Sequence, residues 1–263
     1  MTEHSPLQVR SENGITWIQL NRPEQRNALD IPTLTALTSL LHDLDADDGT
    51  RTVVLTGTGR SFCAGADLAE WAAAEARGEL ETYGWTQAAH KLMVALYHLN
   101  KPTIAAVNGT AVGAGMDLSL CCDFRVAARS ARFKAGYTSM GYCPDAGASW
   151  HLPRLIGLEQ AKLFIFLDEL WNADQALAAG MVGRVVDDHQ LLSCTTELAT
   201  RLASGPTLAH GFTKQLMRDG AKRGLAEQLA AEQDAGLVCG RSEDGIEALR
   251  AVAEKRSPNF IGR

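Results

Sequence analysis

One stretch near the middle of the chain, residues 102–121, most constrains how the chain can fold. It begins with the apolar run Pro102–Val107, which is typical of a buried strand, and ends with the apolar segment Met116–Cys121, which is typical of a helix. Small residues fill the space between them, including Gly109, Gly113 and Gly115. A strand, a tight turn and a helix start leave backbone N–H groups unpaired and aligned with the helix dipole. The stretch therefore predicts either an anion site or a turn packed closely against a neighbour.

A second stretch repeats this pattern earlier in the chain. Thr52–Gly57 reads as a buried strand, and Gly59–Leu68 is another turn of small residues that leads into a helix. The glycine spacing in the two turns matches neither G-x-G-x-x-G nor the phosphate loop that ends in Gly-Lys-Ser/Thr. An oxyanion hole needs two N–H donors that converge on one oxygen, and two such turns can supply one donor each.

Composition and charge exclude several classes of protein. The 263 residues are 46% hydrophobic and 21% charged, which fits one large globular domain or a domain with a helical appendage. The net charge of −6 and the absence of a Lys/Arg cluster argue against a nucleic-acid partner. No apolar stretch is long enough to span a membrane and no signal peptide is evident. The six cysteines form no C-x-x-C pair and no Cys/His cluster, so we expect a reduced cytoplasmic protein without a metal site.

The order of periodic segments predicts an α/β core followed by helices. A β-hairpin is expected over residues 7–20, and Asp30 is expected to cap a helix with Leu34, Leu37, Leu41 and Leu44 on its apolar face. From residue 158 onward the pattern is mostly helical, with one short strand at Gly183–Val186. We expect an α/β core over residues 1–200 and a C-terminal helical region over residues 201–263, where subunits can meet.

Motifs along nearly the whole chain resemble one superfamily. The matching segments appear in the family's order and include Leu20–Pro23, Phe62–Leu68, Lys101–Gly115, Pro144–Gly147 and Glu254–Phe260. Together they resemble the enoyl-CoA hydratase/isomerase (crotonase) superfamily, and most closely the branch of ring-opening isomerases of the phenylacetate pathway. The resemblance implies a crotonase-like spiral of ββα units with a C-terminal helical trimerisation region. It also implies acyl-CoA substrates, no cofactor beyond the CoA moiety, and a homotrimer or hexamer.

The same resemblance implies roles for residues in the two turns and at the C-terminus. By position, the oxyanion-hole donors are the backbone N–H groups of Ala66 and Ala114. The positions that match the family's CoA contacts, in this subunit or in a neighbouring one, are Arg26, Ala64, Asp67, Leu68, Lys255 and Phe260. Two of these have equally simple alternatives, because Arg26 fits a solvated loop cation and Lys255 fits a charge at a helix C-terminus.

The candidate carboxylates depart from the pattern of the family's hydratases. Those enzymes use two glutamates for water activation and proton transfer, whereas this chain aligns Asp117 and Tyr137 with them. A tyrosine phenol is protonated at neutral pH, so Tyr137 cannot act as the second carboxylate. Asp145 lies in Pro144–Gly147, which resembles a segment of isomerases that use a single carboxylate. We therefore expect double-bond or ring isomerisation with Asp145 as the proton shuttle, the alternative for Asp145 being a helix N-cap.

Three other functions stay open on the sequence. The first is an enoyl-CoA hydratase in which Asp117 holds water, although an acid early in a helix can simply complement the dipole. The second resembles 4-halobenzoyl-CoA dehalogenases, with Asp145 as nucleophile and His90 as base, although His90 also fits a surface position. The third is a non-catalytic CoA- or RNA-binding homologue. The acyl group is expected to be selected by Ala72–Trp85, a segment whose composition suggests mobility.

Overall fold

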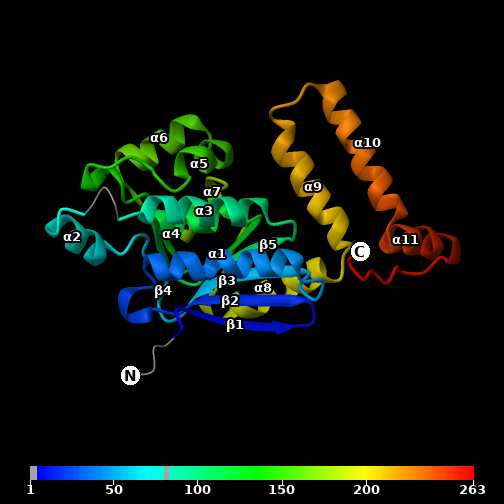
Figure 1. Cartoon of the computed structure of the whole chain (residues 1–263), viewed down its shortest axis with the longest axis horizontal. Coiled ribbons are helices and arrows are strands. Elements are labelled where there is room, and N and C mark those ends of the chain that lie inside the picture. Colours follow the sequence, from blue (N-terminus) through cyan, green and yellow to red (C-terminus); the bar gives the residue numbers. More distant parts are fainter. Residues whose placement is uncertain (1–4, 80–82) are drawn as a thin grey trace.

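The strands of the protein form two sheets in a computed structural model that describes residues 5–79 and 83–263 (Figure 1). The six-stranded sheet has the order β1 (Leu7–Glu12), β2 (Ile15–Leu20), β3 (Thr52–Gly57), β5 (Thr103–Val107), β7 (Phe124–Ala128) and β10 (Arg184–Val186). The four-stranded sheet has the order β4 (Ser61–Cys63), β6 (Thr110–Val112), β8 (Arg132–Lys134) and β9 (Leu170–Asn172). Neighbouring strands are parallel except in the predicted hairpin β1–β2 and in the pair β8–β9.

The chain alternates between the two sheets as it advances. β3 lies in the large sheet, β4 in the small one, and α2 (Leu68–Ala76) follows. The next unit repeats this with β5, β6 and α4 (Ala114–Cys121). Because β4 pairs in parallel with β6, the turns after these two strands lie side by side. The spiral therefore brings together two turns that lie almost fifty residues apart in the sequence.

Short strands are where the sequence predictions were wrong. β4 and β6 lie inside segments interpreted as turns, and β9 is a second strand after residue 158, where only one was expected. Each has three residues, which is too few for an apolar alternation to show. These strands form through pairing with distant segments, such as Cys63 with Ala111, and not through local sequence.

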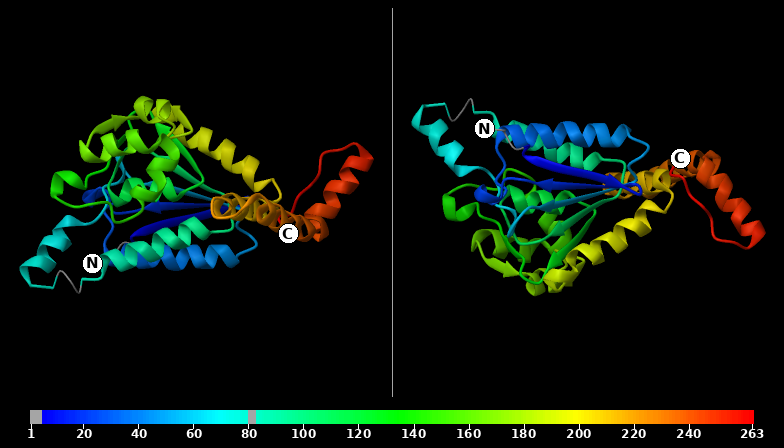
Figure 2. Two further views of the ribbon diagram at one scale, coloured as in Figure 1. Left: turned by 90° about the horizontal axis from the view of Figure 1, so that it is seen from above. Right: turned by 90° about the horizontal axis from the view of Figure 1, so that it is seen from below.

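Helices cover both faces of the large sheet, as Figure 2 shows. On one face, α1 (Ile31–Ala46) packs against α3 (Trp85–His98). The predicted cap of α1 is confirmed, since the Asp30 side chain accepts a hydrogen bond from the Thr33 N–H at 2.8 Å. Its predicted leucine stripe is confirmed as well, because all four leucines are buried. On the other face, α8 (Leu191–Ala203) packs against β3, β5 and β7 and closes a second, smaller core.

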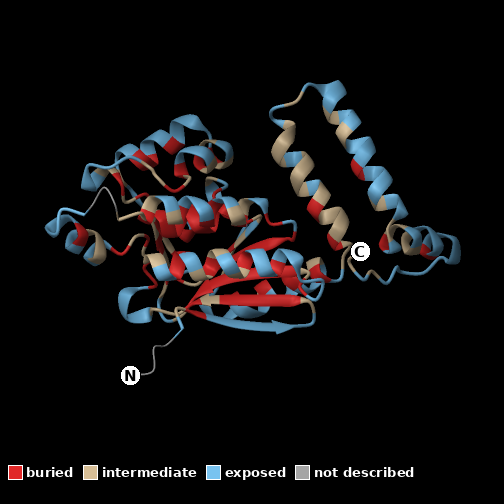
Figure 3. Cartoon of the chain, viewed as in Figure 1, coloured by how far each residue is buried: buried red, intermediate tan, exposed pale blue. Residues whose placement is uncertain are grey.

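Three helices pack over the carboxyl-terminal part of the core, and three more extend from it (Figure 1). The first group comprises α5 (Ala148–Ile156), α6 (Leu158–Phe166) and α7 (Ala173–Ala178). The second comprises α9 (Thr207–Gly220), α10 (Leu225–Arg241) and α11 (Glu243–Glu254). α10 and α11 present mostly exposed surface, whereas most residues of α9 are of intermediate burial (Figure 3). In the described part of the chain, no helix is both long and apolar enough to cross a bilayer. Since α8 runs through residue 200, the division between a core (1–200) and a helical region (201–263) stays a prediction.

Candidate active site

The two turns predicted to carry oxyanion donors meet at one cavity. Gly65 shows how close they are, because a Cβ atom placed there would lie 2.7 Å from the Val112 carbonyl oxygen. Gly65 also has a φ of +88°, which an L side chain rarely adopts, so both its space and its backbone require glycine. Ala66 and Ala114, which follow the two strands, both line the cavity. The structure thus brings the two predicted donor residues to one place.

The N–H groups of Ala66 and Ala114 lie outside the regular hydrogen bonding of the strands and of α4. Leu29 donates its N–H to the Gly65 carbonyl and accepts from the Asp67 N–H, so the N–H of Ala66 between them takes no part in this bridge. Ala114 is the first residue of α4, and the first four N–H groups of a helix have no intrahelical partner. The positive end of the α4 dipole lies at the same point. Together these features suit a negative charge on a ligand atom in the cavity.

Asp145 completes this cavity from a third segment. It lies in the irregular stretch between Met140 and α5 and is about half buried. The N-cap alternative is excluded, because α5 starts at Ala148 and its N-cap residue is Gly147. Burial raises the pKa of the Asp145 carboxyl above its usual value, while its own backbone N–H and the charge of His90 oppose the rise. Among the described residues lining the cavity, Asp145 carries the only carboxylate.

His90 contacts the backbone of Asp145. The imidazole projects from α3, and its Nε2 lies 2.7 Å from the Asp145 carbonyl oxygen. A carbonyl oxygen only accepts hydrogen bonds, so Nε2 carries the proton in this contact. His90 is exposed and is not among the residues that line the cavity. It ties the irregular segment that carries Asp145 to a regular helix.

Asp117 lies behind the cavity wall. Its side chain, in the first turn of α4, is fully buried and accepts a hydrogen bond from the hydroxyl of Tyr137. Burial raises the pKa of Asp117 to about 7, and the Tyr137 hydrogen bond opposes that rise. The ring of Tyr137 lines the cavity, whereas Asp117 does not. The two positions that align with the hydratase glutamates thus contact each other.

Of the six residues that match the family's CoA contacts, two line the cavity and four do not. Ala64 and Leu68 line the cavity, and Leu68 is 49% exposed. The Asp67 carboxylate pairs with Arg22 at 3.0 Å and accepts from the Ala69 N–H at 3.2 Å, so it caps α2.

The remaining three are exposed or distant. Arg26 is exposed, and its carbonyl accepts from the Ala64 N–H at 3.0 Å. Lys255 ends α11, and the Phe260 carbonyl accepts from Arg51 at 2.9 Å. Both belong to the extended C-terminal region, which lies on the opposite side of the molecule from α2 (Figure 1). Within one chain, Lys255 and Phe260 do not approach the cavity.

Three side chains of the cavity wall were not singled out from the sequence: Trp71, Met140 and Tyr142. Trp71 lies in α2, just before the segment expected to select the acyl group. The sequence prediction began at Ala72 and suggested mobility, yet α2 runs through Ala76 and α3 begins at Trp85. Residues 80–82 of that segment lie outside the described residues. The sequence feature that could have identified Trp71 is its place as the one aromatic residue of the alanine-rich helix α2.

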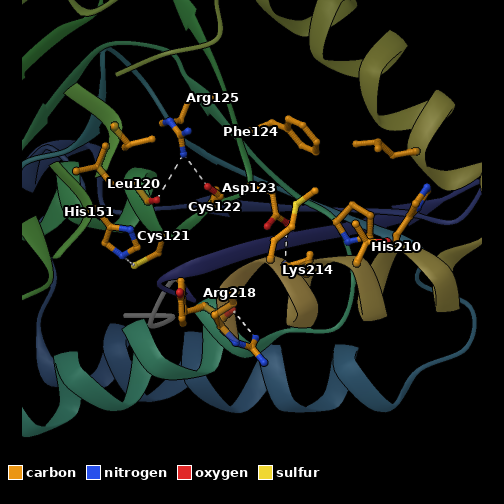
Figure 4. Close-up of a pocket in the computed structure, with 16 residues that line it drawn as sticks. Leu120, Cys121, Cys122, Asp123, Phe124, Arg125, His151, His210, Lys214 and Arg218 are labelled. Carbon is orange, nitrogen blue, oxygen red and sulfur yellow. Dashed lines mark hydrogen bonds and ion pairs between the residues drawn. The ribbon is translucent and has the colours of Figure 1, made fainter. Parts of the chain in front are cut away.

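A larger cavity, of about 580 Å³, lies between the core and α9 (Figure 4). Its charged groups already have partners, since Lys214 pairs with Asp123 at 2.7 Å and Arg125 donates to carbonyls at the end of α4. Cys121 Sγ lies 3.3 Å from His151 Nε2, and burial lowers the pKa of His151 to about 4, so this imidazole is neutral. No predicted site residue lines this cavity. Across residues 5–79 and 83–263, no three His, Cys, Asp or Glu side chains cluster in a way that could hold a metal.

Comparison with known proteins identifies relatives over nearly the full length. A family model described as enoyl-CoA hydratase/isomerase matches residues 10–263. The chain is 38% identical over 254 residues to the 1,2-epoxyphenylacetyl-CoA isomerase of Escherichia coli (strain K12), covering 96% of this chain and 97% of that one. A solved protein from Pseudomonas aeruginosa is 69% identical, covers 89% of this chain and 99% of its own, and superimposes with a TM-score of 0.85. An enoyl-CoA hydratase structure from Bacillus anthracis is 35% identical, covers 98% and 100%, and gives a TM-score of 0.91.

Proposed function

Because the chain belongs to the enoyl-CoA hydratase/isomerase family, we propose that it isomerises an acyl-CoA thioester with Asp145 as the proton shuttle. Membership of the family and the α/β spiral confirm the resemblance and the fold expected from the sequence. Processing of acyl-CoA thioesters is the activity that this family has in common. Isomerisation and the roles of individual residues are the proposal.

The observation that carries the proposal is the composition of the small cavity. Its described lining residues include one carboxylate, Asp145, together with Ala66 and Ala114, whose N–H groups are the proposed donors. Isomerisation needs one group that takes a proton from one carbon and returns it to another. Hydration by two carboxylates needs a second acid or base in the cavity, and Asp117 is enclosed behind Tyr137. The available groups therefore match one-base chemistry.

The proposed reaction balances without any further reactant. With the thioester oxygen between the N–H groups of Ala66 and Ala114, Asp145 removes a proton from C2 of a 3-enoyl thioester. The C–H electron pair forms a C1–C2 double bond as the carbonyl π pair moves to the thioester oxygen, so the dienolate charge rests on that oxygen near the α4 N-terminus. When the C3–C4 π pair takes up a proton at C4, the C1–C2 pair forms the C2–C3 double bond and the carbonyl is restored. Protonated Asp145 then gives the proton to C4, and the conjugated 2-enoyl thioester results. A carboxyl with a raised pKa suits both steps, because it binds the proton more firmly and is still able to return it.

A second candidate uses the same residues in other roles. His90 Nε2 lies 2.7 Å from the backbone carbonyl oxygen of Asp145, so the two residues of a dehalogenase-like mechanism, with Asp145 as nucleophile and His90 as base, are neighbours. In that chemistry, Asp145 displaces chloride from the ring of 4-chlorobenzoyl-CoA to form an aryl ester, and a water activated by His90 hydrolyses the ester to the 4-hydroxybenzoyl thioester. Chloride release by the wild type, in the absence of 3-enoyl isomerisation, would favour it.

The experiment for the main proposal measures conversion of 3-enoyl-CoA to 2-enoyl-CoA by the rise in absorbance of the conjugated thioester. Hydration of the 2-enoyl product is measured in the same sample by chromatography. We expect isomerisation to dominate. Hydration without isomerisation would contradict the proposal and support the hydratase alternative, in which Asp117 holds the water.

We also propose that the chain assembles as a homotrimer or a hexamer. Large apolar side chains are exposed on the extended helices, among them Leu225 (76%), Leu249 (72%) and Val252 (77%). Exposed apolar faces of this kind mark contact surfaces. Light scattering after size-exclusion chromatography would give three or six times the 28.3 kDa chain mass, and a single-chain mass would contradict this assembly.

A further inference from the structure

Arg22 lies in the motif Leu20–Pro23, to which the proposed mechanism gives no role. Its guanidinium joins three segments, because Nη1 donates to the Ala28 carbonyl oxygen at 2.6 Å while Nη2 lies 3.0 Å from the Asp67 carboxylate and 3.1 Å from the Asp30 carboxylate. The three charged side chains are only 10–20% exposed. Salt therefore screens these ion pairs much less than it screens pairs at the surface.

The backbone of Arg22 is held as firmly as its side chain. The Arg22 N–H donates to Asn27 Oδ1 at 3.0 Å, and the Arg22 carbonyl accepts from the Asn27 N–H at 2.8 Å. Asn27 is buried, and its side-chain amide donates in turn to the carbonyls of Thr58 at 2.9 Å and Ser61 at 2.8 Å. The guanidinium thus extends from a loop that is tied to the start of β4, the strand before the first turn of the site.

The contacts of the Arg22 guanidinium lie on both sides of the backbone bridge that includes Ala66. Leu29 and Ala66 are paired in parallel, through one hydrogen bond of 2.7 Å and another of 3.2 Å made by the residues that flank Ala66. Ala28 precedes Leu29 in this bridge, and Asp67 follows Ala66. One guanidinium therefore holds both partners and fixes how the first turn lies against residues 28–29.

Arg22 also balances charge beside the proposed oxyanion hole. Asp30 and Asp67 each use one carboxylate oxygen to cap a helix and the other to pair with Arg22. Within residues 5–79 and 83–263, neither carboxylate pairs with another cation. Without the guanidinium, two carboxylates would lie close together beside Ala66, where the thioester oxygen gains negative charge in the proposed reaction. Repulsion between like charges is strongest where water is excluded, so the dienolate would lose stabilisation.

We propose that Arg22 is a positioning residue, which fixes the Ala66 N–H in the oxyanion hole and offsets the carboxylate charge beside it. This role rests on the proposed function, in which Ala66 is one of the two donors. Arg22 is not among the residues that line the cavity, so it acts through the bridge and through its charge. The task requires arginine, because its planar fork serves a carbonyl with one nitrogen and the carboxylates with another, whereas a lysine ammonium supplies charge at a single point.

The first test measures the strength of the oxyanion hole without turnover. Acetoacetyl-CoA loses a C2 proton to give an enolate that absorbs in the near ultraviolet, so the ratio of enolate to keto form can be followed in the bound state. We expect a higher ratio on the wild type than in free solution, and a ratio about tenfold lower on Arg22→Met than on the wild type. This loss is smaller than the roughly 10²–10³-fold effect of deleting a donor outright, because the Ala66 N–H is displaced and not removed.

A matched control separates this effect from a general loss of stability. Arg129 also pairs with two aspartates, Asp174 at 3.2 Å and Asp187 at 3.0 Å, but on an exposed surface away from the cavity. Arg129→Met should leave the enolate ratio unchanged. The Kd for octanoyl-CoA, which has no β-keto group, should change less than threefold in both variants. An equal enolate ratio on the wild type and on Arg22→Met would overturn the proposal.

Two further variants divide the role into geometry and charge, and keep the test valid if Arg22→Met does not fold. Arg22→Lys keeps the charge and loses the fork, so its enolate ratio should fall by about threefold. Asp67→Asn keeps an oxygen that can cap α2 and removes one carboxylate charge. Combined with Arg22→Met, it should recover part of the lost enolate ratio. A wild-type ratio in Arg22→Lys would exclude the geometric part, and a double variant no better than Arg22→Met would exclude the charge part.

Turnover distinguishes failure of this inference from failure of the proposed function. If the wild type isomerises a 3-enoyl-CoA, Arg22→Met should lower kcat by about tenfold and change KM less than threefold, whereas Arg129→Met should change neither. A full kcat in Arg22→Met would refute the inference and leave the proposed function intact. If the wild type isomerises nothing while the enolate ratio still falls in Arg22→Met, the proposed isomerisation fails and the role of Arg22 in the oxyanion hole stands.

Discussion

Asp145 lines the small cavity whereas Asp117 lies behind its wall, and the contrast between their surroundings supports different roles for the two. Asp145 lies on an irregular segment, is half buried and lines the cavity. Asp117 lies in the first turn of α4, fully buried, and accepts the Tyr137 hydroxyl hydrogen bond. Burial raises the pKa of both carboxyls, but only Asp145 lines the cavity. This difference in access favours Asp145 over Asp117 as the proposed proton shuttle.

The largest effect is expected for Asp145→Asn. An amide cannot take the C2 proton, so kcat for 3-enoyl isomerisation should fall by about 10³-fold or more. The Kd for a CoA thioester should change less than threefold, because the fold of the cavity is kept. Asp117→Asn is the matched control and should retain more than about a tenth of the wild-type kcat. Equal losses in the two variants would break the distinction between the aspartates.

The next largest effect is expected for Ala114→Pro, which deletes one of the two proposed N–H donors. Proline is tolerated at the first position of a helix, and Ala114 holds that position in α4. Removing one oxyanion-hole donor typically lowers kcat by about 10²–10³-fold. The control is Ala114→Ser, which keeps the N–H and should stay within about tenfold of the wild type. A full kcat for Ala114→Pro, with the circular dichroism spectrum unchanged, would exclude Ala114 as a donor.

A third prediction concerns stability at the Asp117–Tyr137 pair. Tyr137→Phe removes the donor to a buried carboxylate, so the free energy of unfolding should fall by about 1–3 kcal/mol, measured by urea denaturation at pH 8. Asp117→Asn should cost less at that pH, since an amide oxygen still accepts the Tyr137 hydrogen bond and no charge is buried.

The same pair predicts a pH dependence. Burial raises the pKa of Asp117 to about 7 in the folded chain, above the ordinary value of 3.8 for an aspartate. The folded state therefore binds more protons than the unfolded state between these values, and stability should fall as pH rises through this window. The free energy of unfolding of the wild type should thus decrease from pH 5 to pH 8 relative to Asp117→Asn. Parallel pH profiles for the two proteins would contradict a buried, titrating Asp117.

The smallest effect is expected for His90→Ala. The loss of one hydrogen bond to the Asp145 carbonyl corresponds to about a two- to tenfold fall in kcat. His90→Gln can restore a donor at a similar reach and should recover part of the loss. A fall of 10³-fold in His90→Ala would instead indicate that the imidazole acts on the substrate, as in the dehalogenase-like candidate.

The sequence predicted the features that repeat locally. The hairpin, the Asp30 cap, the leucine stripe of α1 and the strand–turn–helix units are set by periodicity and turn residues, and all are present. The resemblance added family and fold, both of which are confirmed. The three-residue strands β4, β6 and β9 were not predicted, because they form through pairing with segments distant in the sequence.

The geometry of the site depended on contacts that no local pattern shows. Sequence position suggested Asp117 for water binding, and only the packing of Tyr137 against α4 shows that its carboxylate is enclosed. Likewise, His90 and Asp145 were linked by alignment, but the contact joins the imidazole to a backbone carbonyl and not to the carboxylate. Trp71 was not singled out because its place in the cavity wall depends on contacts with two distant rings, Trp85 and Tyr142.

The measurement that tests the central claim most directly is deuterium exchange at C2 of phenylacetyl-CoA in D2O, followed by NMR. This thioester can lose and regain a C2 proton but cannot complete the isomerisation, so exchange reports proton removal alone. We predict rapid exchange with the wild type and with Asp117→Asn, and no exchange above background with Asp145→Asn. Exchange that persists in Asp145→Asn and is lost in Asp117→Asn would show that the enclosed aspartate, and not the one in the cavity, moves the proton.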